Sequence, residues 1–228
     1  MYGPDLLSNM ATPSHWIIAL LLPCALLVGL GAHWYAAPSN LVPCPFEDPP
    51  AAPDSFTVEL TSTQGPVILQ LYREWAPTGV DRMHCLVEHN HFEGLPVFRV
   101  VEGFVAQFGL TGDPETDSLW AEAGIPDEPV RASNERGTIA FARSGPNTRS
   151  AQLFINLSDN APLDTVDFDG VVGFPPLGRV TDGMETVDAW YSGYGEAVSQ
   201  DSIRTVGTSY LKREHPKLDV IERARIVE

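Results

Sequence analysis

The sequence predicts a mainly β domain, in which a closed or nearly closed antiparallel sheet has helices covering its ends. Short segments of alternating apolar and polar side chains recur between turn residues along most of the chain. Only two or three helical patterns interrupt them, without the regular strand–helix alternation that is typical of parallel sheets. A chain of 228 residues accommodates one such domain and an additional segment, or two small domains.

The predicted strands begin with a hairpin, because apolar residues alternate over 55–62, Gln64 and Gly65 form a turn, and 66–72 continue the pattern. One long strand-like stretch is expected over 95–109. Four later segments also have the composition of strands: 137–144, 151–158, 171–180 and 218–226.

Helices are expected in three places. Residues 76–90 repeat apolar side chains at helical spacing, with Thr78 as the expected N-cap. A second helix is expected from Asp182, and a third over 203–215. Residues 110–129 are polar and are expected to form a loop.

The N-terminal 37 residues are expected to lie outside the domain. Residues 16–32 carry no charged side chain, and this run is at the short end of the length that crosses a membrane. An uncleaved signal anchor and a cleaved signal peptide both remain open, because the preceding residues lack Lys and Arg and no clear cleavage motif follows. Proline-rich residues 38–54 read as an extended linker to a domain over 55–228.

The charge excludes one class of partner. Fourteen Lys and Arg residues stand against 30 Asp and Glu residues, which leaves a net charge of −16. Nucleic acid is therefore not expected as a partner, because its binding needs a basic face that neutralises phosphates. The overall acidity favours cationic partners instead.

Three smaller features leave alternatives open. Cys44 and Cys85 are able to pair in an oxidising compartment, or Cys85 is a buried helix residue. The histidine-rich stretch 84–91 suggests a metal site, but two of its histidines are five residues apart and do not share a helix face, so no metal is expected. Asn156 begins an N-glycosylation sequon, which is usable if the domain is lumenal.

Three segments together resemble the cyclophilin family of peptidyl-prolyl cis-trans isomerases. They are FRVVEGFVAQFG (98–109), FARSGPNTRSAQLFI (141–155) and GRVTDGMETVD (178–188), in the order and spacing of that family. The resemblance extends from about residue 55 to the C-terminus. It implies an eight-stranded antiparallel barrel capped by two helices, an isomerase activity that needs no cofactor, and a monomer.

The resemblance also implies a site. Arg99 would be the catalytic hydrogen-bond donor, with Phe104 and Gln107 beside it. The substrate would be bound by Val105, Ala142, Arg143, Gln152, Phe154 and Leu163.

The chain departs from the family pattern at four places near this site, one of which is Val105 in place of a larger Met. Arg143 replaces the usual Asn, which adds a cation that would favour acidic peptides. Pro162 replaces a Trp, so binding of the immunosuppressant cyclosporin is expected to be weak. Phe168 is the candidate for the place of a family His.

The chemistry explains why one arginine interrupts an apolar strand. An X–Pro amide loses its resonance when it twists, and its nitrogen then accepts a hydrogen bond. A fixed cationic donor such as Arg99 therefore binds the twisted amide more tightly than the planar one. We expect an isomerase that assists exported or unfolded proteins through their proline-containing segments. It would be a single-pass membrane protein with a lumenal or extracytoplasmic domain, or a secreted protein. A non-catalytic module that binds proline peptides on a membrane is the alternative.

Overall fold

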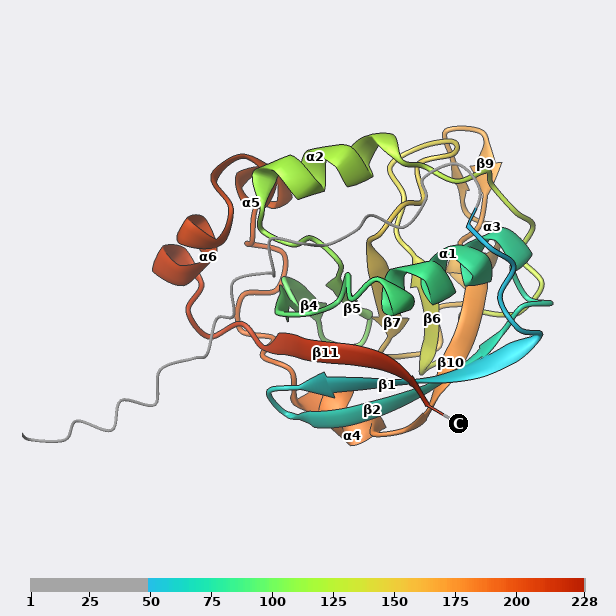
Figure 1. Ribbon diagram of the computed structural model, residues 1–228, viewed down its shortest axis with the longest axis horizontal. Coiled ribbons are helices and arrows are strands. Elements are labelled where there is room, and N and C mark those ends of the chain that lie inside the picture. Colours follow the sequence, from blue (N-terminus) through green and yellow to red (C-terminus); the bar gives the residue numbers. More distant parts are fainter. Residues whose placement is uncertain (1–48, 228) are drawn as a thin grey trace, which may run out of the picture. The chain divides into compact units, whose positions relative to one another are not determined.

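The computed structural model describes residues 49–227, which contain one antiparallel sheet of nine strands. The strands are β1 (Ser55–Ser62), β2 (Gly65–Tyr72), β3 (Leu95–Pro96), β4 (Arg99–Val101), β5 (Val105–Phe108), β6 (Thr138–Phe141), β7 (Leu153–Asn156), β10 (Pro176–Asp182) and β11 (Val220–Val227). Their order is β3-β11-β1-β2-β10-β6-β7-β5-β4 (Figure 1). Only Val97 and Phe98 separate the two edge strands β3 and β4 along the chain, so the sheet is nearly closed.

The predicted mainly β class is therefore confirmed, with nine strands in the sheet where eight were expected. The stretch 95–109, which was expected as one strand-like stretch, divides into β3, β4 and β5. A separate two-stranded sheet pairs β8 (Asp167–Phe168) with β9 (Val171–Val172).

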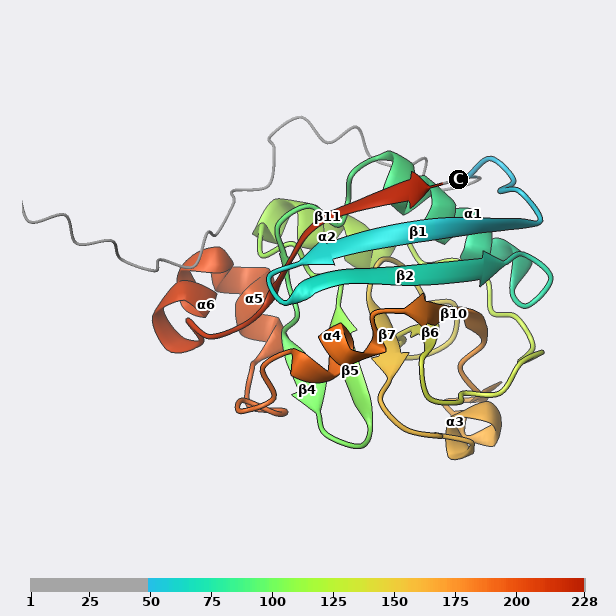
Figure 2. The ribbon, with the colours of Figure 1, turned by 90° about the horizontal axis from the view of Figure 1, so that it is seen from below.

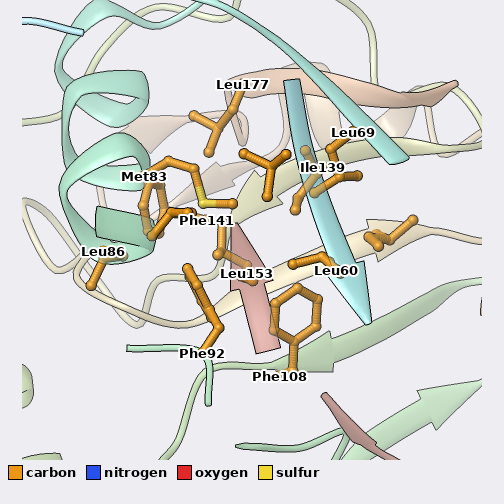
Figure 3. Packing of buried hydrophobic residues seen from close by; sticks show 14 of the residues in the cluster. Leu60, Leu69, Met83, Leu86, Phe92, Phe108, Ile139, Phe141, Leu153 and Leu177 are labelled. Atoms are coloured by element: carbon orange, nitrogen blue, oxygen red, sulfur yellow. The ribbon is translucent and has the colours of Figure 1, made fainter. Parts of the chain in front are cut away.

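The core lies inside the curve of the sheet. Figure 3 shows Leu60, Phe108 and Ile139 gathered beside Met83 of the first helix, and Leu86 of that helix belongs to the same cluster. Each of these side chains is fully buried. Burying one side chain of this size stabilises the fold by about 1.5–3 kcal/mol, so this cluster contributes strongly to the stability of the sheet.

Six helices occur among the described residues. They are α1 (Pro77–Glu88), α2 (Pro114–Glu122), α3 (Pro162–Thr165), α4 (Met184–Ala189), α5 (Gln200–Val206) and α6 (Thr208–Glu214). Helix α1, and the segment formed by α4 and Trp190, both contribute buried side chains to the main core, and they lie on opposite sides of the sheet (Figures 1 and 2). These two are the capping helices that the sequence predicted.

The first turn of α1 is capped differently from the prediction. The N-cap is Ala76, not Thr78, and it makes no side-chain hydrogen bond. The carboxylate of Glu128 instead accepts hydrogen bonds from the backbone N–H of Thr78 at 2.7 Å and of Gly79 at 2.9 Å. Buried Arg149 binds the same carboxylate at 3.0 Å. A distant residue therefore satisfies the free N–H groups of this helix, which no local pattern reveals.

Helix α2 was wrongly expected to be a loop. Its start carries local signals that the polar composition obscured, because Asp113 accepts a hydrogen bond from the Thr116 N–H at 3.0 Å and Pro114 occupies the first turn. Trp120 is the side chain that anchors this short helix in the core.

The predicted helix over 203–215 is two helices. Gly207, with φ of +75°, ends α5 and begins α6. Ile203 and Leu211 from these helices pack with Phe98 and Leu110 in a second buried cluster. Because Phe98 directly precedes Arg99, this cluster fixes α5 beside the strand that carries the predicted catalytic residue.

The N-terminal predictions lie outside the described residues, as do residues 1–48 in general. Within residues 49–227, no helix is long and apolar enough to cross a membrane. Cys85 is buried and disulfide-bonded. Cys24 and Cys44 lie in the part that is not described, so the Cys44–Cys85 pairing stays a prediction.

Candidate active site

The hairpin of β4 and β5 places the predicted catalytic arginine. Arg99 pairs directly with Gln107 across the two antiparallel strands, so both side chains lie on the same face. Gly103 has φ of +69° in the turn between the strands, a conformation that favours glycine. The turn also brings the ring of Phe104 to 5.6 Å from the Arg99 guanidinium carbon.

The guanidinium of Arg99 is held from two sides. Its Nη1 donates a hydrogen bond to Oε1 of Gln107 at 3.3 Å, and its Nη2 lies 2.5 Å from Oε1 of Glu196. Buried Gln107 in turn donates to Oε1 of Gln152 at 3.1 Å. The Arg99 side chain is 22% exposed, so it is fixed in place yet remains accessible to a ligand.

An apolar pocket lies next to this arginine. Val105 and Phe154 are buried and line it, and both belong to one cluster with Ala140. Phe104, Leu163 and Phe174 pack around them, with the rings of Phe154 and Phe174 edge to face at 5.8 Å. The pocket opens into a groove with a volume of about 500 Å³.

The structure brings all of the predicted site residues to this groove. Its lining includes Arg99, Phe104, Val105, Gln107, Ala142, Arg143, Gln152, Phe154 and Leu163. Their placement agrees with the predicted site, and their individual roles stay predictions.

Arg143 lines the groove in a way that the sequence did not predict. Its Nη2 donates to the carbonyl oxygens of Val171 and Gly173, each at 2.8 Å, and its Nη1 donates to that of Phe168 at 3.2 Å. The guanidinium also lies 4.7 Å from the centre of the Phe174 ring. Burial lowers the pKa of Arg143. The side chain ties the β8–β9 hairpin to the groove, and the expected preference for acidic peptides through Arg143 stays a prediction.

Phe174 was missed by the sequence analysis. It lines the groove, whereas Phe168, the candidate for the place of the family His, is 45% exposed and lies over Arg143. The backbone N–H of Phe174 bonds the carbonyl of Leu163 at 2.9 Å, which places the two side chains on one wall. An aromatic residue three positions before Leu-Gly-Arg was the available signal, but Pro175 and Pro176 hid the strand.

Buried asparagine side chains hydrogen-bond to the backbone of residues that form the pocket. Asn134 donates to the carbonyl of Phe174 at 2.9 Å and to the Asp164 carboxylate at 2.8 Å, while Asn160 donates to the carbonyl of Phe104 at 2.9 Å. Asn156 is fully buried, and its amide nitrogen donates to Oγ1 of Thr138 at 2.9 Å. The sequon nitrogen is therefore inaccessible in the folded domain, so glycosylation there is not expected.

Three further residues at the groove come from the segment after α4. Glu196 contacts Arg99, while Gln200 and Arg204 of α5 line the groove directly. Sequence reasoning missed them because only the packing of α5 against α2 and the second buried cluster brings them here.

The histidine-rich stretch 84–91 has a structural role in this fold. His91 is buried, and its Nε2 lies 3.2 Å from the carbonyl oxygen of Gly109, next to the Trp120 ring. Burial lowers the pKa of His91 to about 4, so the imidazole is neutral at physiological pH. Within residues 49–227, no cluster of three or more His, Cys, Asp or Glu side chains is arranged to hold a metal ion.

Comparison with known proteins finds relatives that are named peptidyl-prolyl cis-trans isomerases. Residues 56–208 match the family described as cyclophilin type peptidyl-prolyl cis-trans isomerase. The chain is 36% identical over 137 residues to peptidyl-prolyl cis-trans isomerase cyp18 of Streptomyces antibioticus, covering 58% of this chain and 81% of that one. It is 32% identical over 133 residues to a peptidyl-prolyl cis-trans isomerase of Acinetobacter baylyi, covering 58% and 69% of the two chains.

Solved structures support the fold. A cyclophilin-type isomerase of Cryptosporidium parvum has a TM-score of 0.55 with this chain at 19% identity, covering 76% of this chain and 98% of that one. The same kind of isomerase in the presence of the dipeptide Ala-Pro gives a TM-score of 0.53 at 18% identity, covering 75% and 99%. The sheet with its two capping helices, the family match over residues 56–208 and these relatives together show that the chain belongs to the cyclophilin-type peptidyl-prolyl cis-trans isomerases.

Proposed function

We propose that this isomerase accelerates rotation about X–Pro bonds through Arg99, which donates a hydrogen bond to the proline nitrogen of the twisted amide. The planar amide has no available lone pair on that nitrogen, because resonance delocalises it. The twisted amide has one. An N–H aimed at the nitrogen therefore lowers the barrier without lowering the ground state by the same amount.

The required acceleration is within reach of such a donor and its surroundings. The uncatalysed rotation has a barrier of about 18–20 kcal/mol and takes tens to hundreds of seconds. Bringing it to about a millisecond requires roughly 10⁴- to 10⁵-fold, which corresponds to about 6–7 kcal/mol. The step breaks no covalent bond and moves no electron, so the side chains of the groove supply all the groups that the proposed mechanism uses.

One observation carries the proposal: a fixed arginine borders an apolar pocket that suits a proline ring. Arg99 is held by Gln107 and Glu196, so little entropy is lost when it meets the substrate. The pocket of Val105, Phe154 and Leu163 would hold the ring while the preceding residue rotates. The Ala-Pro dipeptide in the related crystal structure supports proline-containing peptides as the ligand class.

The test is an isomerisation assay of the purified chain on an X–Pro peptide, with Arg99→Ala measured beside it. We expect kcat/KM to fall about 10²- to 10³-fold in the variant, as is typical for loss of one transition-state donor. An Arg99→Ala variant as active as the parent would overturn the mechanism. A parent chain that gives no acceleration would overturn the activity itself, and peptide binding would then be the remaining function.

We further propose that the enzyme acts on exported proteins as a monomer, either anchored through residues 16–32 or secreted after cleavage. The uncharged run supports membrane targeting, and the disulfide-bonded Cys85 supports an oxidising compartment. Carbonate extraction of membranes tests the anchor, because an anchored chain stays in the pellet and a cleaved chain is released. Protease digestion of sealed vesicles tests the side, since a lumenal domain is protected until detergent is added.

A further inference from the structure

The groove differs in charge from the rest of the protein. The chain has a net charge of −16, yet Arg99, Arg143 and Arg204 all line the groove. None of the Asp or Glu residues in the described part of the chain is among its lining residues. The overall acidity predicted cationic partners, whereas the site itself presents a local concentration of positive charge.

Two of the three arginines are already occupied. Arg99 is paired with Glu196 and is assigned to the proline nitrogen. Arg143 donates to three backbone carbonyls and packs on the Phe174 ring, so its hydrogen-bonding capacity is largely used within the protein. Arg204 is the remaining cation of the groove.

Arg204 has only weak competition from its neighbours. Its Nη1 lies 3.6 Å from Asp201 on the same helix, and Asp201 is 96% exposed, so this ion pair contributes little and opens easily. The second carboxylate that acts on it is buried Asp117. That carboxylate already accepts hydrogen bonds from Thr111 N–H at 2.7 Å and Gly112 N–H at 3.0 Å. The Arg204 side chain is 31% exposed and remains available to a ligand.

Arg204, Ser150 and Gln152 form a polar part of the groove, which we call the polar arm. Ser150 and Gln152 line the groove and also a small adjoining cavity, which Arg204 and the buried Asp117 border as well. Gln152 connects this arm to the catalytic side through its hydrogen bond with Gln107. A peptide whose proline occupies the apolar pocket would therefore extend one flank past Gln152 toward the Arg204 guanidinium.

We propose that Arg204 is a specificity-determining residue that binds the carboxylate of an Asp or Glu side chain flanking the X–Pro bond. A guanidinium recognises a carboxylate through paired, charge-assisted hydrogen bonds, and Ser150 and Gln152 add polar partners. This inference rests on the isomerase function proposed above. It places substrate selection on α5, which contributes no residue to the proline pocket.

The test compares pairs of peptides that are identical except for Glu or Gln at one position. That position is moved in turn through the three residues before and the three residues after the X–Pro unit. We expect at least one position at which Glu raises kcat/KM about five-fold over Gln, which corresponds to about 1 kcal/mol. Arg204→Gln should reduce that ratio to about one. Arg213→Gln, at an exposed position of α6 paired with Glu214, is the matched control and should leave the ratio unchanged.

Salt provides a second readout on the intact enzyme. The preference for Glu should shrink between low and high ionic strength, because screening weakens a partly exposed charge pair. The Glu-to-Gln ratio of kcat/KM tests this inference separately from the isomerase function. An active enzyme with no preference for Glu at any position overturns only the role of Arg204. A preference for Glu that survives Arg204→Gln also overturns the role of Arg204. Loss of all turnover in the parent overturns the proposed function instead.

Discussion

The Nη2 atom of Arg99 lies 2.5 Å from Oε1 of Glu196, a residue 97 positions later in the chain. Glu196 is 69% exposed, so the contact lies at the rim of the groove. Nη1 on the other side of the guanidinium donates to Gln107. The two contacts together fix the plane of the guanidinium, which decides where its remaining N–H groups point.

Glu196 is therefore a positioning residue for Arg99. We expect Glu196→Ala to lower kcat about two- to five-fold with a smaller change in KM, because an exposed ion pair contributes about 0.2–1 kcal/mol. Glu196→Gln should recover most of the loss, since the amide oxygen still accepts a hydrogen bond. Steady-state kinetics on one X–Pro peptide separates the two parameters.

The control for this prediction is Glu102→Gln. Glu102 lies in the turn between β4 and β5, and its Oε1 accepts a hydrogen bond from Ser192 at 2.7 Å. Ser192 belongs to the same loop as Glu196, so Glu102 attaches to that loop through Ser192 and not through Arg99. Its kcat should stay at the parent value. Equal losses in the Glu196 and Glu102 variants would mean that loop attachment, rather than guanidinium orientation, is responsible.

Phe174 should matter for substrate binding although the sequence analysis missed it. Its ring forms one wall of the apolar pocket against Phe154. We expect Phe174→Ala to lower kcat/KM about five- to ten-fold, mainly through a higher KM, because contact with the proline ring is lost in the ground state and the transition state alike. Phe168→Ala, at an exposed ring outside the groove lining, should change kcat/KM less than two-fold.

The parts of the site that the sequence predicted are those determined by adjacent strands. Arg99 and Gln107 are opposite each other in one hairpin, and Phe154 lies opposite Gln107 on β7, so local pairing is enough to gather them. Glu196 and Arg204 reach the groove only because α5 packs against α2 and a separate buried cluster. Such placements depend on tertiary contacts that no periodicity encodes.

Arg143 shows a second limit of reading residue types alone. A cation in a binding motif suggests a ligand contact, but the fold surrounds this one with carbonyl groups of the β8–β9 hairpin and its end. Helix α2 shows the reverse case, because its Asp113-Pro114 start is a local helix signal that its polar composition obscures.

The β8–β9 hairpin should depend on Arg143. Arg143→Gln removes most of the donors to the carbonyls of Val171, Gly173 and Phe168. We expect a loss of about 1–3 kcal/mol in unfolding free energy and faster amide hydrogen exchange confined to residues 166–173. Hydrogen exchange by mass spectrometry checks this, with Arg179→Gln on β10 as an exposed control. Unchanged exchange in the hairpin would show that the loop is stable without the guanidinium.

Buried His91 should make the domain less stable in mild acid. Burial lowers its pKa from 6.5 to about 4 in the folded state. The unfolded chain therefore binds an additional proton between pH 6.5 and about pH 4, and stability falls as pH falls through that window. The slope reaches about 1.4 kcal/mol per pH unit, with a total of roughly 3 kcal/mol from this one group.

The pH effect is measurable as a difference between the parent and His91→Gln in denaturant unfolding at a series of pH values. Other groups contribute to each curve, and Asp117 has the opposite sign, because burial raises the pKa of that carboxyl and protonation then favours the folded state. These contributions are common to both proteins and cancel in the difference. The variant should start less stable at pH 7, since the contacts with Gly109 and Trp120 are altered, and should lose less stability by pH 4.5. Parallel curves would show that water or a local opening lets His91 protonate in the folded state.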